Sequence, residues 1–465
     1  KKISNEYNKG KFICEVWEKL ENDEWGNYQK ISKTDFYKRK EEFLPNHVLI
    51  YYSGNSDRLQ NVYIDHQRNY YLEIIKPEAK KKKISNLRRI FLVQNIHSKL
   101  ALLSFFIFND KNKEVLKFLQ EELGIIDLHS LLMVFKKPIW SKTSSEKDMF
   151  WNSGGLVRSF LEKLWDFALA PIYNIENVPV SYKNSESQER LYLYIENKGK
   201  ISQLAKENYD NSLQFFNALE STYISDLIEN IKINILKKTA SDIIPFTEMS
   251  EGEQQLLTVF GMLKFLKEKE SLVLLDEPDT HLNPIWKWKY LDYFQEYIGR
   301  DATTQILIST HDPLIIGGLK KEQIKIFRTD KNNKIITETP EIDPIGLGVA
   351  GILTSELFGL PTTLDKPTQE LLDERNNLIY TDSIRELTDA ERERLKELFI
   401  EINSLGFTYT FKDPMYTKFI AEIANLEQFK TTKRLSKEDI KKQNETALKI
   451  LDNLFKKEKD DLHRQ

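Results

Sequence analysis

A short apolar run that ends in two carboxylates limits the possible folds more than any other feature of this sequence. Residues Ser271–Leu275 are almost entirely apolar, and Asp276 and Glu277 follow directly. Such a run is typical of a parallel strand buried on both faces. Taken alone, the pair is also compatible with a strand that ends in solvated acids. Within an α/β fold, however, the carboxyl ends of parallel strands are where ligands bind.

A helix is predicted shortly before this strand. Met249–Gln255 is largely polar, and apolar residues then recur at helical spacing up to Leu266. Ser250 is expected to cap the start of the helix, and Gly252 to permit a close approach by another part of the chain. A helix N-terminus carries unpaired N–H groups and the positive end of the helix dipole, so this element is suited to receive a phosphate.

A second buried strand is predicted further along the chain. Pro284–Ile298 has the pattern of a crossover helix, and Gln305–Ile308 is again largely apolar. Parallel strands joined by such a crossover end at the same edge of a sheet. His311 follows the second strand, so it is expected beside Glu277, able to donate a hydrogen bond to a γ-phosphate.

Three segments stand in the order found in ABC-type ATPases. Residues 249–255 resemble the signature of that family, residues 274–284 its Walker B segment with the D-loop, and residues 309–313 its H-loop. The chain is similar in this respect to the non-transporter members. The resemblance implies an α/β fold: a P-loop NTPase-type parallel sheet with an antiparallel β subdomain, a helical insertion and a C-terminal helical region.

The resemblance also assigns roles to individual residues. In a P-loop ATPase, Asp276 would hold Mg²⁺ through water, whereas Glu277 would orient and polarise the attacking water. Adjacent residues of a strand point to opposite sides, which separates the two roles. The family dimerises head to tail and encloses two ATP molecules between the P-loop of one subunit and the signature of the other, so Asp279 and His281 are expected across the dimer interface. The residues expected at the ATP are Ser250, Gly252, Glu253, Gln254, Asp279 and, as a second catalytic residue, His311.

Further segments resemble one group within this class. They are Leu44–Val48, Tyr51–Gly54, the Glu-Gln-Gln form of the signature at residues 253–255, and Ile352–Leu360. These segments are similar to the ATPase subunit of Septu-type and retron-associated anti-phage systems. That resemblance implies nucleotide-driven dimerisation or higher oligomerisation of the heads, which controls an HNH-type nuclease. In retrons the partners also include a reverse transcriptase with its DNA or RNA.

The P-loop itself is missing from the sequence. No Gly-x-x-x-x-Gly-Lys-Ser/Thr run occurs in the 465 residues, and Gly10-Lys11 and Gly199-Lys200 lack both the earlier glycine and the following hydroxyl. Without that loop no backbone cradles the β-phosphate. Because the family places the P-loop ahead of its first β subdomain, and Lys1 is an unusual first residue, a preceding segment is expected. The alternative is a head that only completes the ATP site of a partner.

Four parts of the chain are expected. Residues 1–89 form the N-terminal part of the head, with an antiparallel β region within Lys11–Ser32. Residues 90–240 form a helical insertion that includes the signature subdomain, and residues 241–330 complete the head from the signature to the H-loop. Residues 331–465 form a mostly helical partner-binding region. No apolar heptad persists for three or four repeats, so long coiled-coil arms are not expected.

Composition narrows the class of protein. A formal charge of −3, from 68 basic and 71 acidic residues, gives no global attraction to nucleic acid. A local patch such as Lys80–Lys83 could contact phosphates, although a lysine run is also typical of a solvated loop. Cys14 is the only cysteine, which excludes a disulfide framework and fits a cytoplasmic location. No run approaches 18 apolar residues, so no membrane span is expected.

Two other functions remain open from the sequence. A protein of the overcoming-lysogenization-defect type would join a similar head to a Toprim nuclease, which needs an Asp-x-Asp pair that does not occur after His311. A DNA-repair-type ABC ATPase would share the head but not the defence partner. A transporter subunit is disfavoured by the Ser-Glu-Gly-Glu signature and by the long insertion.

Overall fold

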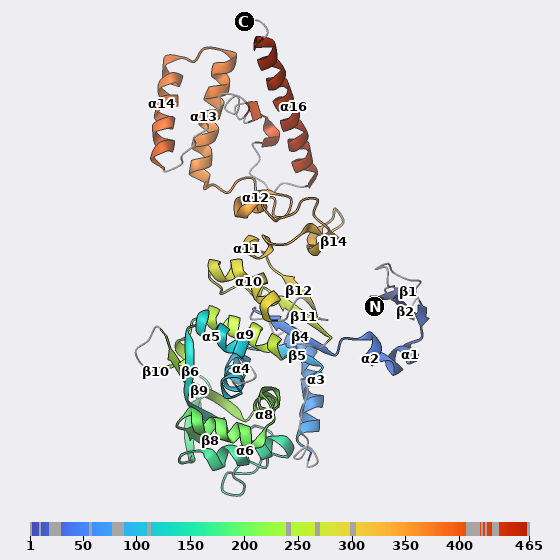
Figure 1. The fold of residues 1–465 in the computed structure, drawn as a ribbon, viewed down its shortest axis with the longest axis vertical. Helices are drawn as coiled ribbons and strands as arrows, with labels where there is room; N and C mark the ends of the chain where they lie inside the picture. The colour runs from blue at the N-terminus through green and yellow to red at the C-terminus, as the bar shows by residue number, and fades with distance from the viewer. Residues whose placement is uncertain are drawn as a thin grey trace. The chain divides into compact units, whose positions relative to one another are not determined.

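The computed structural model divides the chain into two compact units. Unit 1 is Lys1–His311 and unit 2 is Asp312–Gln465 (Figure 1). This boundary differs from the predicted end of the head near residue 330, because residues 312–330 group with the C-terminal unit. The structure describes residues 2–8, 11–17, 29–54, 58–76, 88–108, 113–238, 243–265, 270–297, 304–405, 419, 422–423, 426–429 and 437–462.

A four-stranded parallel sheet forms the central layer of unit 1. Its order is β12-β11-β4-β5, and every neighbouring pair runs parallel. The strands are β4 (His47–Tyr52), β5 (Ile90–Val93), β11 (Ser271–Asp276) and β12 (Gln305–Ser309). The crossover helix α10 (Pro284–Tyr297) joins β11 to β12, and α9 (Glu251–Lys264) precedes β11. The predicted α/β fold with a parallel sheet is confirmed.

The two strands that lead to the polar edge differ in burial. β11 lies inside the sheet, and Val273 and Leu275 are buried. In β12 no side chain is fully buried, and Leu307 is 51% exposed. Among the described residues β12 is one of the two edge strands, so its apolar side chains lack a neighbour on one side. The prediction of a second buried strand is right about the strand and its direction but wrong about its burial.

The N-terminal residues form an antiparallel sheet. β1 (Lys2–Asn8) pairs with β2 (Lys11–Trp17), and β2 pairs with β3 (Gln29–Ile31). This agrees with the antiparallel region predicted within Lys11–Ser32. The lysine run at residues 80–83 lies outside the described residues.

The region predicted as a helical insertion, residues 90–240, contains most of a third sheet. Five antiparallel strands lie in the order β10-β9-β6-β8-β7. They are β6 (Ile125–Lys136), β7 (Ile172–Pro179), β8 (Ser185–Ile195), β9 (Ile228–Lys237) and β10 (Ile243–Pro245). The helical prediction is therefore wrong, and its start at residue 90 is wrong because β5 belongs to the parallel sheet. Tyr192 and Tyr194 alternate with buried leucines in β8, so a nearly apolar run conceals the strand period.

Helices pack around the parallel sheet and the five-stranded sheet of unit 1. α4 (Ile96–Ile107) is apolar on all sides, and residues 100–107 are all buried. Such a helix belongs in a core. Because α4 contacts both α8 and α9, it joins the insertion to the predicted phosphate-binding helix. The other α-helices in the described part of unit 1 are α1 (Lys33–Lys38), α2 (Lys40–Phe43), α3 (Arg58–Ile74), α5 (Lys113–Glu121), α6 (Gly155–Phe167), α7 (Lys198–Asn208) and α8 (Ser212–Ile224).

Glu189 on β8 organises the loop that leads to α6. Its carboxylate accepts hydrogen bonds from the Ser145 N–H at 2.8 Å and from the Trp151 indole N–H at 3.0 Å, and it lies 3.0 Å from the Lys137 ammonium. Burial by itself would raise the pKa of this carboxyl, but the hydrogen bonds outweigh burial and lower the pKa to about 2. The carboxylate therefore acts as a charged anchor for a loop whose Trp151 is fully buried.

Replacing Glu189 by glutamine is expected to lower the free energy of unfolding by roughly 1–2 kcal/mol at pH 7, because charge-assisted hydrogen bonds are lost while the shape is kept. A depressed carboxyl pKa stabilises the fold above the ordinary value of 4.5, and this contribution is lost as the pH falls toward 2. Urea denaturation of both proteins between pH 7 and pH 3 should show the difference shrinking with falling pH. A difference that stays constant with pH would contradict the role assigned to the charge.

Unit 2 contains a short hairpin near its start and is otherwise mainly helical. β13 (Ile326–Thr329) pairs antiparallel with β14 (Ile335–Glu338). Ile326 packs with Ile352 and Leu357 in a small core. The α-helices described at full length in unit 2 are α11 (Pro313–Ile316), α12 (Gly348–Thr354), α13 (Lys366–Ile384), α14 (Asp389–Ser404) and α16 (Lys437–Leu462).

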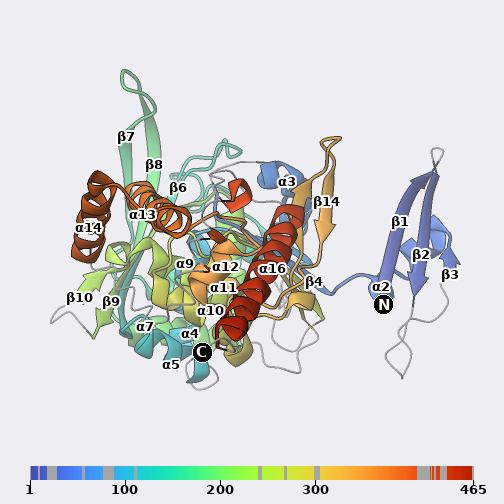
Figure 2. The same ribbon diagram turned by 90° about the horizontal axis from the view of Figure 1, so that it is seen from above.

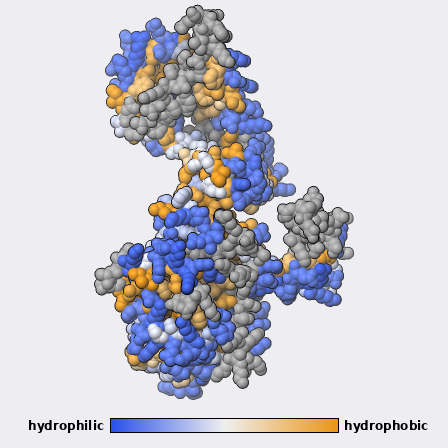
Figure 3. Space-filling model, viewed as in Figure 1, coloured by the Kyte–Doolittle hydropathy of each residue, from blue (hydrophilic) through white to orange (hydrophobic). Residues whose placement is uncertain are grey.

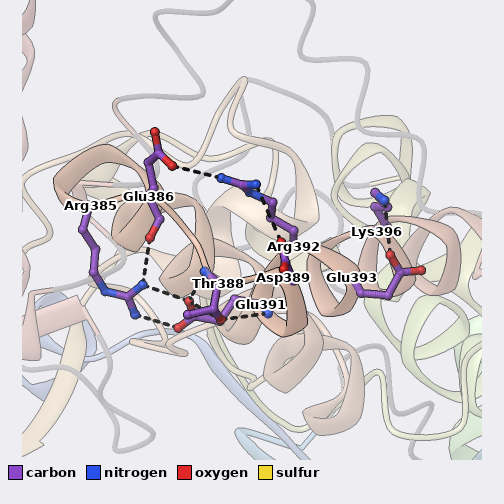
Figure 4. A network of polar contacts seen from close by, with 8 residues as sticks. All are labelled: Arg385, Glu386, Thr388, Asp389, Glu391, Arg392, Glu393 and Lys396. Carbon is purple, nitrogen blue, oxygen red and sulfur yellow. Dashed lines mark hydrogen bonds and ion pairs between the residues drawn. The ribbon is translucent and has the colours of Figure 1, made fainter.

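An ion-pair network fixes the connection between α13 and α14 (Figure 4). Arg385 donates to both carboxylate oxygens of Glu391, at 2.7 and 2.9 Å, and the Thr388 N–H donates to the same group at 2.9 Å. The hydrogen bonds from Arg385 and Thr388 lower the pKa of the Glu391 carboxyl to about 2. Arg392 lies 3.4 Å from Glu386 in the same turn. The network therefore defines where α13 ends and α14 begins.

The surface mixes hydrophilic and hydrophobic side chains on the face drawn in Figure 3. The β7–β8 hairpin projects from the body of unit 1 (Figure 2), and Tyr182 at its tip is fully exposed. In the part of the chain that the structure describes, no helix is both long and apolar enough to cross a membrane.

Candidate functional site

The carboxyl ends of β11 and β12 meet at one edge of the parallel sheet. Asp276, the last residue of β11, is the register partner of Ser309, the last residue of β12. The Glu277 N–H donates to the Ser309 carbonyl at 2.9 Å, and the Ser309 hydroxyl donates to the Asp276 carboxylate. The structure therefore brings the two predicted segments together at the expected edge.

Glu277 and His311 lie side by side at this edge. His311 Nδ1 is 2.7 Å from Glu277 Oε2, and the two side chains are 81% and 31% exposed. This agrees with the predicted position of His311. A partly exposed carboxylate next to an imidazole is able to orient a water molecule and to take up a proton from it.

Glu277 leaves the strand with an unusual backbone conformation. Its φ is 50°, in the left-handed region that residues other than glycine seldom adopt. The chain therefore turns directly after Asp276, and the two carboxylates enter different surroundings: Asp276 contacts Ser309, whereas Glu277 contacts His311. The predicted separation of the two acids is present, but a turn produces it rather than alternation along a strand.

The N-terminus of α9 is fixed by a capping box. Ser250 Oγ accepts from the Glu253 N–H at 3.2 Å, and the Glu253 carboxylate accepts from the Ser250 N–H at 2.8 Å. Glu253 also pairs with Lys237 of β9, and Gln254 Nε2 donates to the Met249 carbonyl at 2.9 Å. The side chains of Glu253 and Gln254, expected at the nucleotide, are thus engaged within the chain. The first turn of α9 still offers backbone N–H groups, which attract anions.

Gly252 allows α9 to touch the turn that follows β11. A Cβ atom at this position would lie 2.5 Å from the His281 carbonyl oxygen, so there is no room for a side chain. Gln255 Oε1 accepts from the His281 N–H at 3.1 Å, and Glu251 Oε2 lies 3.1 Å from His281 Nδ1. The predicted close approach at Gly252 is present, and it places the start of α9 against the turn that carries Glu277.

Asp279 does not lie where the resemblance implied. Its side chain is 2% exposed and lies 3.8 Å from Lys287 Nζ on α10, whereas the His281 side chain is 44% exposed. The expectation that both residues lie across a dimer interface is therefore corrected for Asp279, which faces the interior of its own chain. The ammonium that α10 supplies compensates the buried charge.

A polar cavity of about 470 Å³ opens beside the start of α9. Its lining comes from the carboxyl ends of β4 and β5, from α3 and from α9, and it includes Tyr51, Ser53 and Gln255. Burial raises the pKa of the Tyr51 phenol, and a hydrogen bond with Gln255 partly offsets this effect. Asp276 and Glu277 are not among the lining residues, so the cavity lies beside the two acids rather than between them.

The oxygen groups at the sheet edge suit a hard cation. The carboxylates of Asp276 and Glu277 and the hydroxyl of Ser309 are ligand types that Mg²⁺ prefers, and Mg²⁺ commonly takes one or two carboxylates together with water and phosphate. Among the residues that the structure describes, no group of three or more metal-binding side chains is found. The carboxylate of Asp276 and the hydroxyl of Ser309 would therefore suit a Mg²⁺ ion that is also bound by water and phosphate oxygens.

A family model covers most of unit 1. Residues 15–317 match the family described as AAA domain, putative AbiEii toxin, Type IV TA system. The chain belongs to this AAA-domain family. The match includes the whole parallel sheet, α9 and the edge that carries Glu277 and His311, which agrees with a P-loop ATPase head.

This AAA-domain protein is similar to proteins of known defence systems. Septu protein PtuA of Bacillus mycoides (strain KBAB4) is 23% identical over 215 residues, which cover 44% of this chain and 29% of the relative. Septu protein PtuA of Bacillus thuringiensis is 22% identical over 233 residues, 47% of this chain and 55% of the relative. Retron Vc95 probable ATPase of Vibrio cholerae is 26% identical over 202 residues, 36% of this chain and 38% of the relative. Each match spans less than two thirds of the relative's length.

The sequence motifs of this AAA-domain protein did not single out every polar residue near the edge. They located Glu277 and His311, but they gave no role to Ser53 or Thr280, whose hydroxyl oxygens lie 3.0 Å apart. Ser53 follows β4, which runs parallel to β11. The argument that placed His311 at the edge could therefore have found Ser53 as well, because all parallel strands end on the same side.

Proposed function

We propose that this chain is the ATP-hydrolysing subunit of an anti-phage defence complex. The observation that carries the proposal is the contact of Glu277 with His311 at 2.7 Å, next to Asp276 at the carboxyl edge of a parallel sheet. Membership of the AAA-domain family supports the ATPase assignment. The relatives named as Septu proteins and as a retron ATPase support the defence assignment.

Each group at the edge has a task in the proposed reaction, which converts ATP and water to ADP and phosphate. Glu277 orients the water and takes up its proton as the water oxygen attacks the γ-phosphorus, and the bond from that phosphorus to the β,γ-bridging oxygen breaks. His311 donates a hydrogen bond to a γ-phosphate oxygen. Asp276 would hold Mg²⁺, which offsets negative charge on the phosphates.

ATP is proposed to lie between two heads arranged head to tail. The first turn of α9, from Ser250 to Gly252, would meet the γ-phosphate of an ATP held mainly by the other head. No P-loop pattern occurs in these 465 residues, and the proposal assigns none of them to the β-phosphate. Closing of the heads would control an HNH-type nuclease docked on residues 331–465, and in a retron arrangement a reverse transcriptase with its DNA or RNA would join the complex.

The full-length protein with ATP and Mg²⁺ provides the test. We expect the protein to release phosphate from ATP, and we expect EDTA to abolish this activity by chelating Mg²⁺. We also expect the molar mass measured by light scattering to double when ATP is present. Absence of both ATP binding and phosphate release in the full-length protein would overturn the proposal. DNA cleavage by the isolated chain would favour the alternative, a nuclease of the overcoming-lysogenization-defect type.

A further inference from the structure

The turn after β11 is closed mainly by a side-chain hydroxyl. Glu277 has a φ of 50°, a conformation that persists in a residue other than glycine only when neighbouring contacts hold it. The main-chain bond across this turn, from the Thr280 N–H to the Glu277 carbonyl, is 3.4 Å long and therefore weak. The Thr280 hydroxyl reaches the same carbonyl oxygen at 2.8 Å. The hydrogen bond from the Thr280 hydroxyl to the Glu277 carbonyl is thus stronger than the one from the Thr280 N–H.

Ser53, which follows β4, extends this contact. Its hydroxyl oxygen lies 3.0 Å from the hydroxyl oxygen of Thr280. A carbonyl oxygen cannot donate, so the single proton of the Thr280 hydroxyl is used on Glu277, and Ser53 must be the donor to Thr280. The result is a directed chain of hydrogen bonds from Ser53 through Thr280 to the Glu277 carbonyl.

Ser53 also contacts the neighbouring acid. Its N–H donates to the Asp276 carbonyl at 3.2 Å, which extends the parallel pairing of β4 with β11 beyond the last strand residue. Ser53 therefore reaches the main chain of Asp276 directly and that of Glu277 through Thr280. A single residue of the adjacent strand thus fixes the point at which the chain turns between the two acids.

We propose that Ser53 and Thr280 are positioning residues of the ATPase reaction. Their hydroxyl chain keeps the Glu277 main chain in its left-handed conformation, and this conformation keeps the carboxylate beside His311. The inference rests on the proposed ATPase function. Both hydroxyls act through Glu277 rather than on the reacting atoms, so their loss lets the turn relax and moves the carboxylate away from the attacking water.

A purely structural role for these hydroxyls can be distinguished from a positioning role by what their removal changes. Thr280 is exposed and Ser53 is half-buried, so water can replace either hydrogen bond, and the fold is expected to tolerate the loss. Binding of ATP depends on other groups. The effect of a positioning role should therefore be seen in kcat and not in KM or in the melting temperature.

Steady-state ATP hydrolysis by the full-length protein tests the proposal. Ser53→Ala and Thr280→Val should each lower kcat about tenfold with KM unchanged, whereas Ser53→Thr and Thr280→Ser keep a hydroxyl and should retain most of the activity. The double variant S53A/T280V should be no slower than T280V alone, because both changes break the same chain. Ser181→Ala, which removes a turn hydroxyl from the distant β7–β8 hairpin, is the matched control.

A second measurement is independent of catalysis. The imidazole NMR resonance of His311, assigned with a His311→Gln variant, should shift in T280V and in S53A but not in S181A. Normal kcat in both hydroxyl variants, or an unmoved His311 resonance, would overturn the positioning role. A wild-type protein that releases no phosphate would instead count against the ATPase function, and the His311 resonance would still decide whether the hydroxyls hold the turn.

Discussion

In a Glu277→Gln variant, phosphate release is expected to fall by a factor of about 100 or more, while ATP binding persists. The amide keeps the size of the side chain and its position near His311, but it cannot take up a proton from the attacking water. In the proposed head-to-tail dimer both heads carry the change, so ATP-bound dimers should accumulate in the closed form. Single-turnover phosphate release and ATP-dependent molar mass from light scattering measure the two effects.

The control for this variant is a second carboxylate on unit 1. Glu296 on α10 is exposed, and Glu296→Gln makes the same chemical change away from the sheet edge. Its rate should stay within about twofold of the wild type. A Glu277→Gln protein that still hydrolyses ATP at the normal rate would show that another group activates the water. Loss of ATP binding in that variant would show that Glu277 serves binding and not proton transfer.

Replacing Arg88 by methionine is expected to lower the free energy of unfolding by roughly 3–5 kcal/mol, because it leaves a buried carboxylate without its counter-charge. Arg88, just before β5, pairs with Glu220 on α8, and the two side chains are 7% and 1% exposed. The guanidinium also lies 4.6 Å from the Phe91 ring centroid and 5.2 Å from that of Tyr63. Chemical denaturation measures the loss. The Arg88–Glu220 ion pair joins α8 of the insertion to the parallel sheet, so Arg88→Met should destabilise both parts.

The pH dependence of the Arg88→Met variant gives a second check. Burial holds the pKa of the Glu220 carboxyl above its usual range even with Arg88 beside it. A raised carboxyl pKa means that the folded state keeps a proton which the unfolded state has already lost, so stability falls as the pH rises through that window. Removing Arg88 raises the pKa of the Glu220 carboxyl further, so this pH range extends to higher pH. The deficit of the variant should therefore be larger at pH 8 than at pH 5.

Two further variants separate the charge from the packing. R88M/E220Q leaves no buried charge and should recover most of the lost stability. Arg39→Met breaks an exposed ion pair with Glu42, where both side chains are nearly half exposed, and should change stability by less than about 1 kcal/mol. A double variant as unstable as R88M alone would mean that Arg88 acts through its ring contacts and not through Glu220.

The strands and helices around the sheet edge could be predicted because short sequence patterns indicate each of them. The apolar run before Asp276, the capping spacing of Ser250 and Glu253, and the crossover before His311 each depend on a few neighbouring residues. Parallel pairing then places the strand ends together without any knowledge of the rest of the fold. The sheet edge and most of its polar groups could therefore be predicted.

The insertion could not be predicted in the same way. β6 pairs with β8 and β9, which lie far along the chain, and only this pairing shows which residues of an apolar run face inward. Outward-facing tyrosines in β8 weaken the alternation that would have indicated a strand. The helical periodicity of α5 and α6 is visible in the sequence, and it favoured a helical region. In the structure, strands and helices alternate there.

The amino-acid sequence is enough to predict which chemical groups lie at the sheet edge: Asp276, Glu277 and His311 after parallel strands, and a helix start at Ser250 that suits a phosphate. How these groups are oriented depends on the folded chain. Glu277 takes a left-handed φ because Ser309 and the hydroxyl of Thr280 hold its main chain. Strand ends and helix starts follow from local patterns, whereas the conformation of a turn depends on contacts between segments that are distant in sequence.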